Sequence, residues 1–278
     1  MSVYQAVGDL ERRNEPGALC IIVRSRGSTP RRTTSKMLVY ADGSIAGTIG
    51  GGEMESRVIA EAQQAIRDGR PRLLEYSMTD PQRGDPGVCG GQLEVFVEPI
   101  QPKATVLVIG SGHVGKAVAY LAHWLGFRVV VSDDRPEFCT PEAVPEADDY
   151  ILAPMAELPE HFRITPWTYI VLTTRGVTID VPGLPALLDS PAAYLGVIGS
   201  RRRWAITHEK LLEAGVSAEK LEQVHSPIGL ELNAETPEEI AVSIMAEIIM
   251  LRQGGNGRPM AETNPAKREA QAQQEELS

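Results

Sequence analysis

A glycine-rich turn with the spacing of a phosphate-binding loop lies near the middle of the chain. The apolar run Val106–Ile109 leads directly into Gly110, Gly112 and Gly115, which have the spacing G-x-G-x-x-G. Such a loop uses its first glycine for a tight turn, its second for close backbone approach to a phosphate and its third for close packing of helix on sheet. The pattern predicts that this turn binds a phosphorylated ligand.

The residues after this loop complete a unit of strand, loop, helix and strand. The segment Lys116–Gly126 carries apolar residues at helical spacing, and the N-terminal end of such a helix favours an anion. A second strand, Phe127–Ser132, leads into Asp133, about 20 residues after the glycines, where an acid that binds ribose belongs. His113, inside the loop, is a further candidate ligand contact. The same unit serves dinucleotides, mononucleotides and other phosphorylated ligands, so the ligand stays open.

Three consecutive glycines form a second candidate anion site in the first half of the chain. Gly50, Gly51 and Gly52 precede Glu53, which begins a segment with helical spacing of apolar residues up to Asp68. Backbone N–H groups at a helix start hold anions well. Three adjacent glycines also cost more backbone entropy than a simple connecting turn requires. We predict that this segment contacts a ligand, and a plain turn is the alternative.

Two further segments carry groups that suit an oxyanion or a soft metal. The loop Arg26–Lys36 is rich in hydroxyls and cations, with Gly27, Ser28 and Arg31 as candidate contacts, although a solvated hairpin loop is the alternative. Cys89 lies among glycines that leave its thiol unshielded, which favours the thiolate that binds metals or accepts sulfur. The alternative for Cys89 is a small buried hydrophobic residue.

A cluster of cations is expected where a later strand ends and a helix begins. Ser200 and Arg201 stand at this point and are candidate ligand contacts, followed by Arg202 and Arg203. Three arginines at a helix N-terminus oppose the helix dipole, so a negative group is expected beside them. It is either a ligand phosphate at the carboxyl edge of the sheet or an acidic neighbour in the chain.

The order of elements predicts an α/β protein of two domains. Residues 1–100 are expected to form a mixed α/β domain, with Asp42-Gly43 as a hairpin turn. Its elements are helices at 2–14 and 53–68 and strands at 18–25, 37–40, 44–49, 73–78 and 92–97, followed by a linker at 98–103.

Residues 104–253 alternate strand and helix, which predicts a Rossmann-like, doubly wound parallel sheet. Its further strands are expected at 168–173 and 194–198. Thr236–Glu239 has the pattern of a helix start, and the helix 237–252 carries a wide apolar stripe that a partner surface must cover. Residues 254–278 are expected to be a disordered tail.

Composition narrows the classes of function. The chain has 278 residues, 42% hydrophobic and 23% charged, with apolar runs far too short to span a bilayer and no signal-peptide pattern. Three cysteines without a C-x-x-C pair fit a reducing compartment, so we expect a cytoplasmic protein that does not bind membranes. The net charge of −10 argues against general nucleic-acid binding.

Several stretches taken together resemble the xanthine dehydrogenase accessory proteins of the XdhC/CoxI family. They occur in order over residues 1–252, and the combination is far more specific than any one stretch. The matching segments are Gly27–Pro30 followed by Met37, Gly50–Glu53, Cys89–Gly91, Phe96–Pro99, Gly110–Gly115, Asp133–Pro136, Gly199–Arg201, Ser226–Leu230 and Thr236–Ala241. One position departs from the family, which often has glycine a few residues before Met37, where this chain has Thr34.

The resemblance implies a protein that binds molybdenum cofactor, protects it during sulfuration and helps insert it into a molybdenum hydroxylase of the xanthine or carbon monoxide dehydrogenase type. A cysteine desulfurase is a further implied partner, and no catalytic residue is implied. Together with the apolar helix at 237–252, the resemblance favours a homodimer.

This cofactor is a phosphorylated pterin with a dithiolene-held metal, so its host needs phosphate-binding backbone, polar contacts and a soft ligand. We hypothesise that Gly50–Gly52 and Gly110–Gly115 hold it jointly in a cleft between the domains. Arg201 would be the countercharge, and Cys89 would lie near the metal.

Two other functions stay open. The Rossmann-like unit and Asp133 also favour an NAD(P)-dependent oxidoreductase, although the first domain offers no well-placed histidine, lysine or tyrosine as a proton donor. A nucleotide-binding regulator is the third interpretation.

Overall fold

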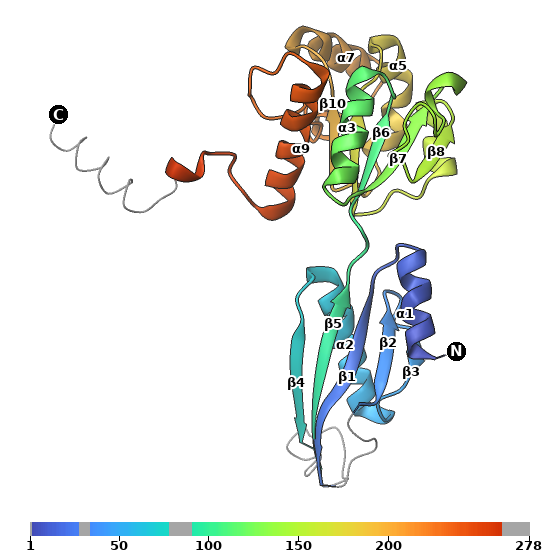
Figure 1. The fold of residues 1–278 in the computed structure, drawn as a ribbon, viewed down its shortest axis with the longest axis vertical. Coiled ribbons are helices and arrows are strands. Elements are labelled where there is room, and N and C mark those ends of the chain that lie inside the picture. The colour runs from blue at the N-terminus through green and yellow to red at the C-terminus, as the bar shows by residue number, and fades with distance from the viewer. Residues whose placement is uncertain (1, 28–33, 78–90, 263–278) are drawn as a thin grey trace, which may run out of the picture. The chain divides into compact units, whose positions relative to one another are not determined.

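The chain divides into two compact units, Met1–Lys103 and Ala104–Ser278. The computed structural model describes residues 2–27, 34–77 and 91–262. The predicted fold class is confirmed, because the first unit contains a mixed arrangement of helices and antiparallel strands and the second contains a parallel sheet covered by helices (Figure 1). Within the described ranges, no helix is both long and apolar enough to cross a membrane.

The first unit is built on a sheet with the strand order β3-β2-β1-β5-β4. Its strands are β1 (Gly17–Arg26), β2 (Lys36–Tyr40), β3 (Ile45–Gly47), β4 (Arg72–Ser77) and β5 (Gln92–Ile100). The predicted hairpin is confirmed, since β2 pairs antiparallel with β3 and Gly43 adopts a φ of +86° in the turn between them.

One helix covers each face of this sheet. Helix α1 (Val3–Arg12) begins with a capping box made by Ser2 and Gln5 and packs against Leu38 of β2. Helix α2 (Gly52–Asp68) packs on the opposite face, against Met37 and Val39. This division follows from the alternation of side chains along a strand.

The end of β5 differs from the prediction. The expected linker began at Glu98, but the strand continues through Pro99 to Ile100 and pairs with β1 to its end. Strand β4 pairs with β5 only as far as Val97, so beyond that point one side of β5 has no partner strand among the described residues. Proline, which has no N–H to donate, is tolerated where a strand has a free side.

The second unit contains a parallel sheet with the order β10-β9-β6-β7-β8. Its strands are β6 (Thr105–Ile109), β7 (Arg128–Asp133), β8 (Asp149–Leu152), β9 (Thr168–Leu172) and β10 (Tyr194–Val197). Chain order reverses direction at β6, the position at which open α/β sheets bind ligands beyond their carboxyl ends. Strand β8 is absent from the prediction because it is four residues long and only partly buried.

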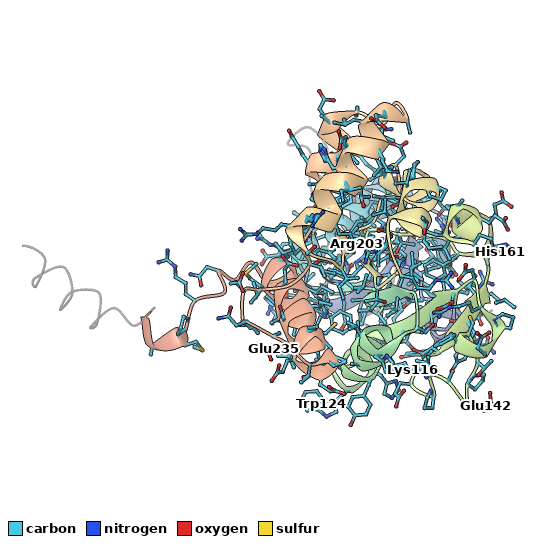
Figure 2. All side chains as sticks on the ribbon, turned by 90° about the horizontal axis from the view of Figure 1, so that it is seen from above. Lys116, Trp124, Glu142, His161, Arg203 and Glu235 are labelled. Atoms are coloured by element: carbon cyan, nitrogen blue, oxygen red, sulfur yellow. The ribbon has the colours of Figure 1, made fainter. Side chains whose placement is uncertain are left out.

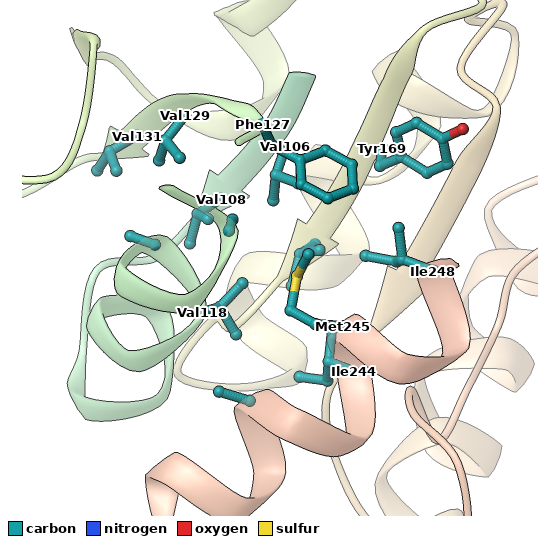
Figure 3. Close-up of a cluster of buried hydrophobic side chains, with 14 of the residues drawn as sticks. Val106, Val108, Val118, Phe127, Val129, Val131, Tyr169, Ile244, Met245 and Ile248 are labelled. Carbon is teal, nitrogen blue, oxygen red and sulfur yellow. The ribbon is translucent and has the colours of Figure 1, made fainter. Parts of the chain in front are cut away.

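Helices cover both faces of the parallel sheet. On one face lie α3 (His113–Trp124) and α9 (Pro237–Gln253), and Figure 3 shows side chains of Val118, Ile244 and Met245 from these helices meeting the valines of β6 and β7. The other face is covered by segments that include α5 (Val177–Gly183) and α7 (Arg201–Glu213). The remaining helical segments are η2 (Pro136–Phe138), η3 (Met155–Glu157), α4 (Leu158–His161), α6 (Pro185–Leu188), α8 (Ala218–Glu222) and η4 (Met260–Glu262).

The predicted start of α9 is confirmed in detail. Thr236 and Glu239 form a capping box, and Gly254 ends the helix in a left-handed conformation. Its apolar stripe, with Ile244 and Ile248 fully buried, packs within the second unit, so the covering surface belongs to this unit itself. The homodimer prediction therefore rests on the family resemblance alone. Of the predicted tail, residues 263–278 lie outside the described ranges.

Candidate functional site

Each glycine of the G-x-G-x-x-G loop has a different structural surrounding. Gly110 adopts a φ of +98°, and a Cβ there would lie 2.8 Å from the carbonyl oxygen of Thr173. A Cβ on Gly115 would lie 2.1 Å from the carbonyl oxygen of Gly110, which confirms close packing of helix on strand. A Cβ on Gly112 would meet nothing within 4 Å. The loop is therefore tight at its two ends and open at its centre.

Helix α3 begins directly at this open glycine. The predicted helix started at Lys116, but α3 starts at His113 with Gly112 as its N-cap. In the part of the chain that the structure describes, no side chain caps this end, and its first turn has no acidic residue. The N–H groups of a first helical turn have no acceptor inside the helix, and the helix dipole adds positive potential. The loop and the helix end together form a site suited to a phosphate.

Asp133 holds this loop in place. Its Oδ2 accepts the Ser111 backbone N–H at 2.8 Å, and Oδ1 accepts Nε of Arg135 at 2.8 Å. Burial raises the pKa of Asp133, but hydrogen bonds from Arg135 and Ser111 outweigh it and hold the pKa below its ordinary value. Both carboxylate oxygens are thus engaged within the chain, and ribose binding, which stays a prediction, would have to displace Arg135.

A pocket of about 220 Å³ lies beside the loop, at the carboxyl ends of β6, β7, β8 and β9. Gly110, Gly112 and Asp133 line it, so the structure brings three predicted residues together, while His113, Ser200 and Arg201 lie outside its wall. Ser132 also lines the pocket, and its Oγ is buried without a hydrogen-bond partner in the described part of the chain. The sequence signal for Ser132 is one hydroxyl directly after three consecutive valines.

The arginine cluster divides into two exposed residues and one that is partly buried. Ser200 caps α7 by accepting the N–H of Arg203 at 3.2 Å, and Arg201 and Arg202 are exposed. Arg203 (labelled in Figure 2) donates to the fully buried carboxylate of Asp180 at 2.7 Å. The acidic neighbour, one of the two predicted alternatives, is therefore present for Arg203. The role of Arg201 as a ligand countercharge stays a prediction.

The loop of three consecutive glycines in the first unit is bonded to side chains of the chain itself, whereas a loop open to a ligand was expected. Gly50, Gly51 and Gly52 adopt φ values of +143°, +76° and +70°, so each position favours glycine for its backbone conformation. The N–H groups of Ile49 and Gly51 donate to Oε2 of Glu55 at 3.0 and 3.2 Å, and the Gly50 N–H donates to Oγ1 of Thr48.

A carboxylate of the chain itself thus occupies part of the glycine loop before this helix. Glu55, which the sequence pattern does not single out, occupies donors that were expected to face a ligand. The neighbouring predicted residue, Glu53, pairs with Arg57 at the surface. Ligand contacts through the N–H groups of Gly50 and Gly51 would require these internal bonds to open.

Comparison with known proteins decides the family. A model described as the XdhC Rossmann domain matches residues 106–248, and one described as the XdhC and CoxI family matches residues 10–77. The chain belongs to the XdhC and CoxI family. The resemblance predicted from the sequence is confirmed.

Three curated relatives illustrate the range of the family. The chain is 38% identical over 261 residues to the Escherichia coli uncharacterized protein YqeB and 35% identical over 158 residues to a Bacillus subtilis protein named as a probable xanthine dehydrogenase subunit. These matches cover 92% and 57% of this chain but 47% and 46% of the relatives, so the chain spans about half their length. The E. coli molybdenum cofactor insertion chaperone PaoD is 25% identical, with 84% of this chain and 83% of PaoD covered.

A solved structure of a Bacillus halodurans xanthine dehydrogenase is similar over 95% of this chain and 98% of its own, with a TM-score of 0.49 and 22% identity.

Several residues predicted for this XdhC-family site have no described structure. Ser28, Arg31 and Cys89 lie outside the described residues, whereas Gly27 ends the described part of its loop with a φ of +73°. Within the described ranges, no group of three or more histidine, cysteine, aspartate or glutamate side chains could hold a metal ion. Joint binding of one ligand by both glycine segments stays a prediction.

Thr34 has a left-handed backbone conformation that favours glycine. Its φ is +77°, which is strained for a β-branched residue by about 1–2 kcal/mol. Because glycine costs about 0.5–1 kcal/mol of extra unfolded-state entropy, we expect Thr34→Gly to raise the free energy of unfolding by about 0.5–1 kcal/mol. Thr34→Ala, which keeps a Cβ, should give little of this gain in the same urea titration. An equal gain from both variants would contradict the strain.

Glu55 should make the first unit sensitive to acid. Burial raises the pKa of this carboxyl, but hydrogen bonds from Thr48, Ile49 and Gly51 bring it below the ordinary value of 4.5. A lowered folded-state pKa gives stability that is complete above pH 4.5 and is lost as pH falls through the lowered pKa.

Urea unfolding at a series of pH values tests this expectation. Glu55→Gln should lower stability at pH 7 by about 1–2 kcal/mol and flatten the decline in acid. Glu53→Gln is the matched control, and since its ion pair is at the surface, it should change stability by less than about 0.5 kcal/mol. Equal acid sensitivity in wild type and Glu55→Gln would remove Glu55 from this account.

Proposed function

We propose that this chain binds molybdenum cofactor and delivers it to a molybdenum hydroxylase. Family membership supports this proposal, and two relatives carry names that fit it, a molybdenum cofactor insertion chaperone and a probable xanthine dehydrogenase subunit. Because the chain spans about half of the first relatives, its client is identified only as a class, the hydroxylases of the xanthine or carbon monoxide dehydrogenase type.

The observation that carries the proposal is the open, uncapped start of α3 at Gly112. The cofactor is a phosphorylated pterin, and a helix N-terminus with free space above a glycine fits its phosphate. Gly112 and His113 would hold that phosphate, with Arg201 as an exposed countercharge. When bound, the group supplies the molybdenum and dithiolene that the client uses, and the chain binds and shields it.

The finer parts of the proposal come from the resemblance and from the residues. The resemblance gives protection of the cofactor during sulfuration, contact with a cysteine desulfurase and a homodimer, while the three cysteines without a C-x-x-C pair give a cytoplasmic location. The place of Cys89 near the metal comes from its chemistry, because a thiolate is a soft ligand or sulfur acceptor.

Purification from cells with and without molybdenum cofactor biosynthesis tests the function. We expect pterin and molybdenum to copurify only from the producing cells, and we expect that preparation to activate a cofactor-free hydroxylase. NAD(P)-dependent oxidoreduction is the alternative. If the chain retained no pterin but bound NAD(P) tightly and turned it over, oxidoreduction would become the better supported function.

Cys89→Ser tests the soft-ligand role separately. We expect the variant to keep the pterin, because the phosphate contacts are intact, but to retain less molybdenum and to activate the hydroxylase less. Cys20→Ser is unsuitable as a control because Cys20 is fully buried, so Cys139→Ser, at 9% exposure, is the better one. Molybdenum content and hydroxylase activation equal to wild type would remove Cys89 from the mechanism.

A further inference from the structure

The pocket beside the glycine loop has apolar walls that suit a flat ring. Its lining includes apolar residues from the ends of β6 and β8, from η3 and from α5. They are Ile109, Ala153, Pro154, Met155, Ile179 and Pro182. Its volume of about 220 Å³ is smaller than the roughly 300–1,000 Å³ of sites that enclose a whole drug-sized ligand. The pocket therefore suits one ring system, with the rest of the ligand outside.

Ser132 supplies an unused polar group in this wall. Along β7, Val129 and Val131 face α3 and α9, while Val130 faces the α5 side, so alternation places Ser132 on the α5 side with the pocket. Ser132 is fully buried, and its Oγ has no hydrogen-bond partner among the described residues. A buried hydroxyl without a partner is unfavourable, so this one is explained by a ligand atom that pairs with it.

The phosphate site opens into the same pocket. Gly112, the N-cap of α3, lines the pocket together with Ser132, so one ligand can place a phosphate at the helix start and a ring against the apolar wall. A ring with a polar edge, joined to a phosphate, is the chemistry of a nucleotide and also of a phosphorylated pterin.

Arg203 leaves little room for the second half of a dinucleotide. A dinucleotide lies across the switch point and extends over the carboxyl ends of the strands on its other side, here β9 and β10. The Arg203 guanidinium donates to the backbone oxygen of Thr174, just after β9. Its Cδ lies 2.7 Å from where a Cβ on Gly199, just after β10, would be. The Arg203 side chain thus covers both strand ends.

The polar edge of the ring distinguishes adenine from its alternatives. A pterin or a guanine carries a carbonyl, a ring N–H and an amino group on one edge. The pocket also has polar side chains, but Arg135 bonds to Asp133, Arg175 to Asp134 and Thr174 to Asp180. Several groups of a pterin or guanine edge would therefore lose their hydrogen bonds. Adenine carries one amino group and acceptor nitrogens, so fewer of its groups depend on the wall.

From these contacts we infer that the second unit binds an adenine mononucleotide, with its base in this pocket, its phosphate at Gly112 and its base edge paired with Ser132. This site goes beyond cofactor delivery. It gives the chain a nucleotide ligand that is not a redox coenzyme.

Calorimetric titration of the full chain, purified from cells that make no molybdenum cofactor, tests the inference. The probes are AMP, GMP, NAD⁺ and 6-hydroxymethylpterin phosphate. We expect one AMP to bind per chain, and the other three to bind at least about tenfold more weakly, a difference of about 1.4 kcal/mol. No saturable AMP binding, or binding of any other probe as tight as that of AMP, would overturn the inference. The AMP phosphate and the cofactor phosphate would share the position at Gly112, so the two ligands would exclude each other there. Failure of AMP binding alone would leave cofactor binding to be decided by the separate cofactor-retention experiment.

Two buried serines separate a ligand contact from a structural one. Ser132→Ala should weaken AMP binding about tenfold, yet raise the Tm of the ligand-free chain by about 2–4 °C, because it removes an unpaired buried hydroxyl. Ser243→Ala is the matched control, since its Oγ donates to the carbonyl of Leu230, and it should lower the Tm and leave AMP affinity unchanged. Unchanged AMP affinity in Ser132→Ala would overturn the assignment of Ser132.

Discussion

Gly115→Ala is expected to lower the free energy of unfolding of the second unit by about 2–3 kcal/mol. The added Cβ would lie 2.1 Å from the carbonyl oxygen of Gly110 and 2.9 Å from Oγ1 of Thr173. The first of these atoms is backbone, so α3 must move away from β6 to make room. Alanine gains about 1 kcal/mol over glycine in a helix, which offsets only part of that strain.

Gly112→Ala is the matched control in the same loop. Gly112 has a φ of −69°, which alanine adopts freely, and an added Cβ meets nothing within 4 Å. Alanine is a poorer N-cap than glycine, but it also lowers the entropy of the unfolded chain. Because these two effects oppose each other, the free energy of unfolding should change by less than about 1 kcal/mol. Urea unfolding followed by tryptophan fluorescence measures both variants. Equal losses in the two would contradict the different surroundings of these glycines.

Arg203→Met is expected to lower the free energy of unfolding of the second unit by about 3–5 kcal/mol. The variant removes the cation that pairs with Asp180, whose side chain is completely buried. It would leave that carboxylate with a hydrogen bond from Thr174 and no countercharge from Arg203. An unpaired buried charge is far more costly than a missing surface ion pair.

Arg202→Met, at the adjacent exposed position, is the control and should change stability by less than about 0.5 kcal/mol. Adding Asp180→Leu to Arg203→Met should recover part of the loss, because the uncompensated charge is then gone. If Arg203→Met behaved like Arg202→Met, or if the double variant recovered nothing, the buried ion pair would not be the cause.

The elements that could be predicted from the sequence are those with local signals. Helix α9 was recognisable because Thr236, Pro237, Glu239 and Gly254 act on the backbone within a few residues of themselves. The glycine loop was recognisable for the same reason. Strand β8 has no comparable signal, since four partly buried residues form a strand only because β7 provides a partner.

The site residues that could not be predicted owe their roles to contacts across the fold. Glu55 resembles any helical glutamate until its helix start folds back onto the glycine loop. Arg203 is one of three arginines, and only the position of α5 sets it apart by bringing Asp180 within 2.7 Å. Asp133 has the expected position, but its hydrogen bonds with Arg135 and Ser111 depend on the folded geometry, which the spacing of residues in the sequence does not reveal.

Cofactor binding at the open glycine that begins α3 is tested most directly by the pterin and molybdenum content of wild type and Gly112→Ala. Both chains would be purified in parallel from cells that make molybdenum cofactor. Wild type should retain both components, and the variant, equally stable but with a methyl group in the phosphate position, should retain about tenfold less. Equal retention by the two chains, or none in wild type, would contradict the account.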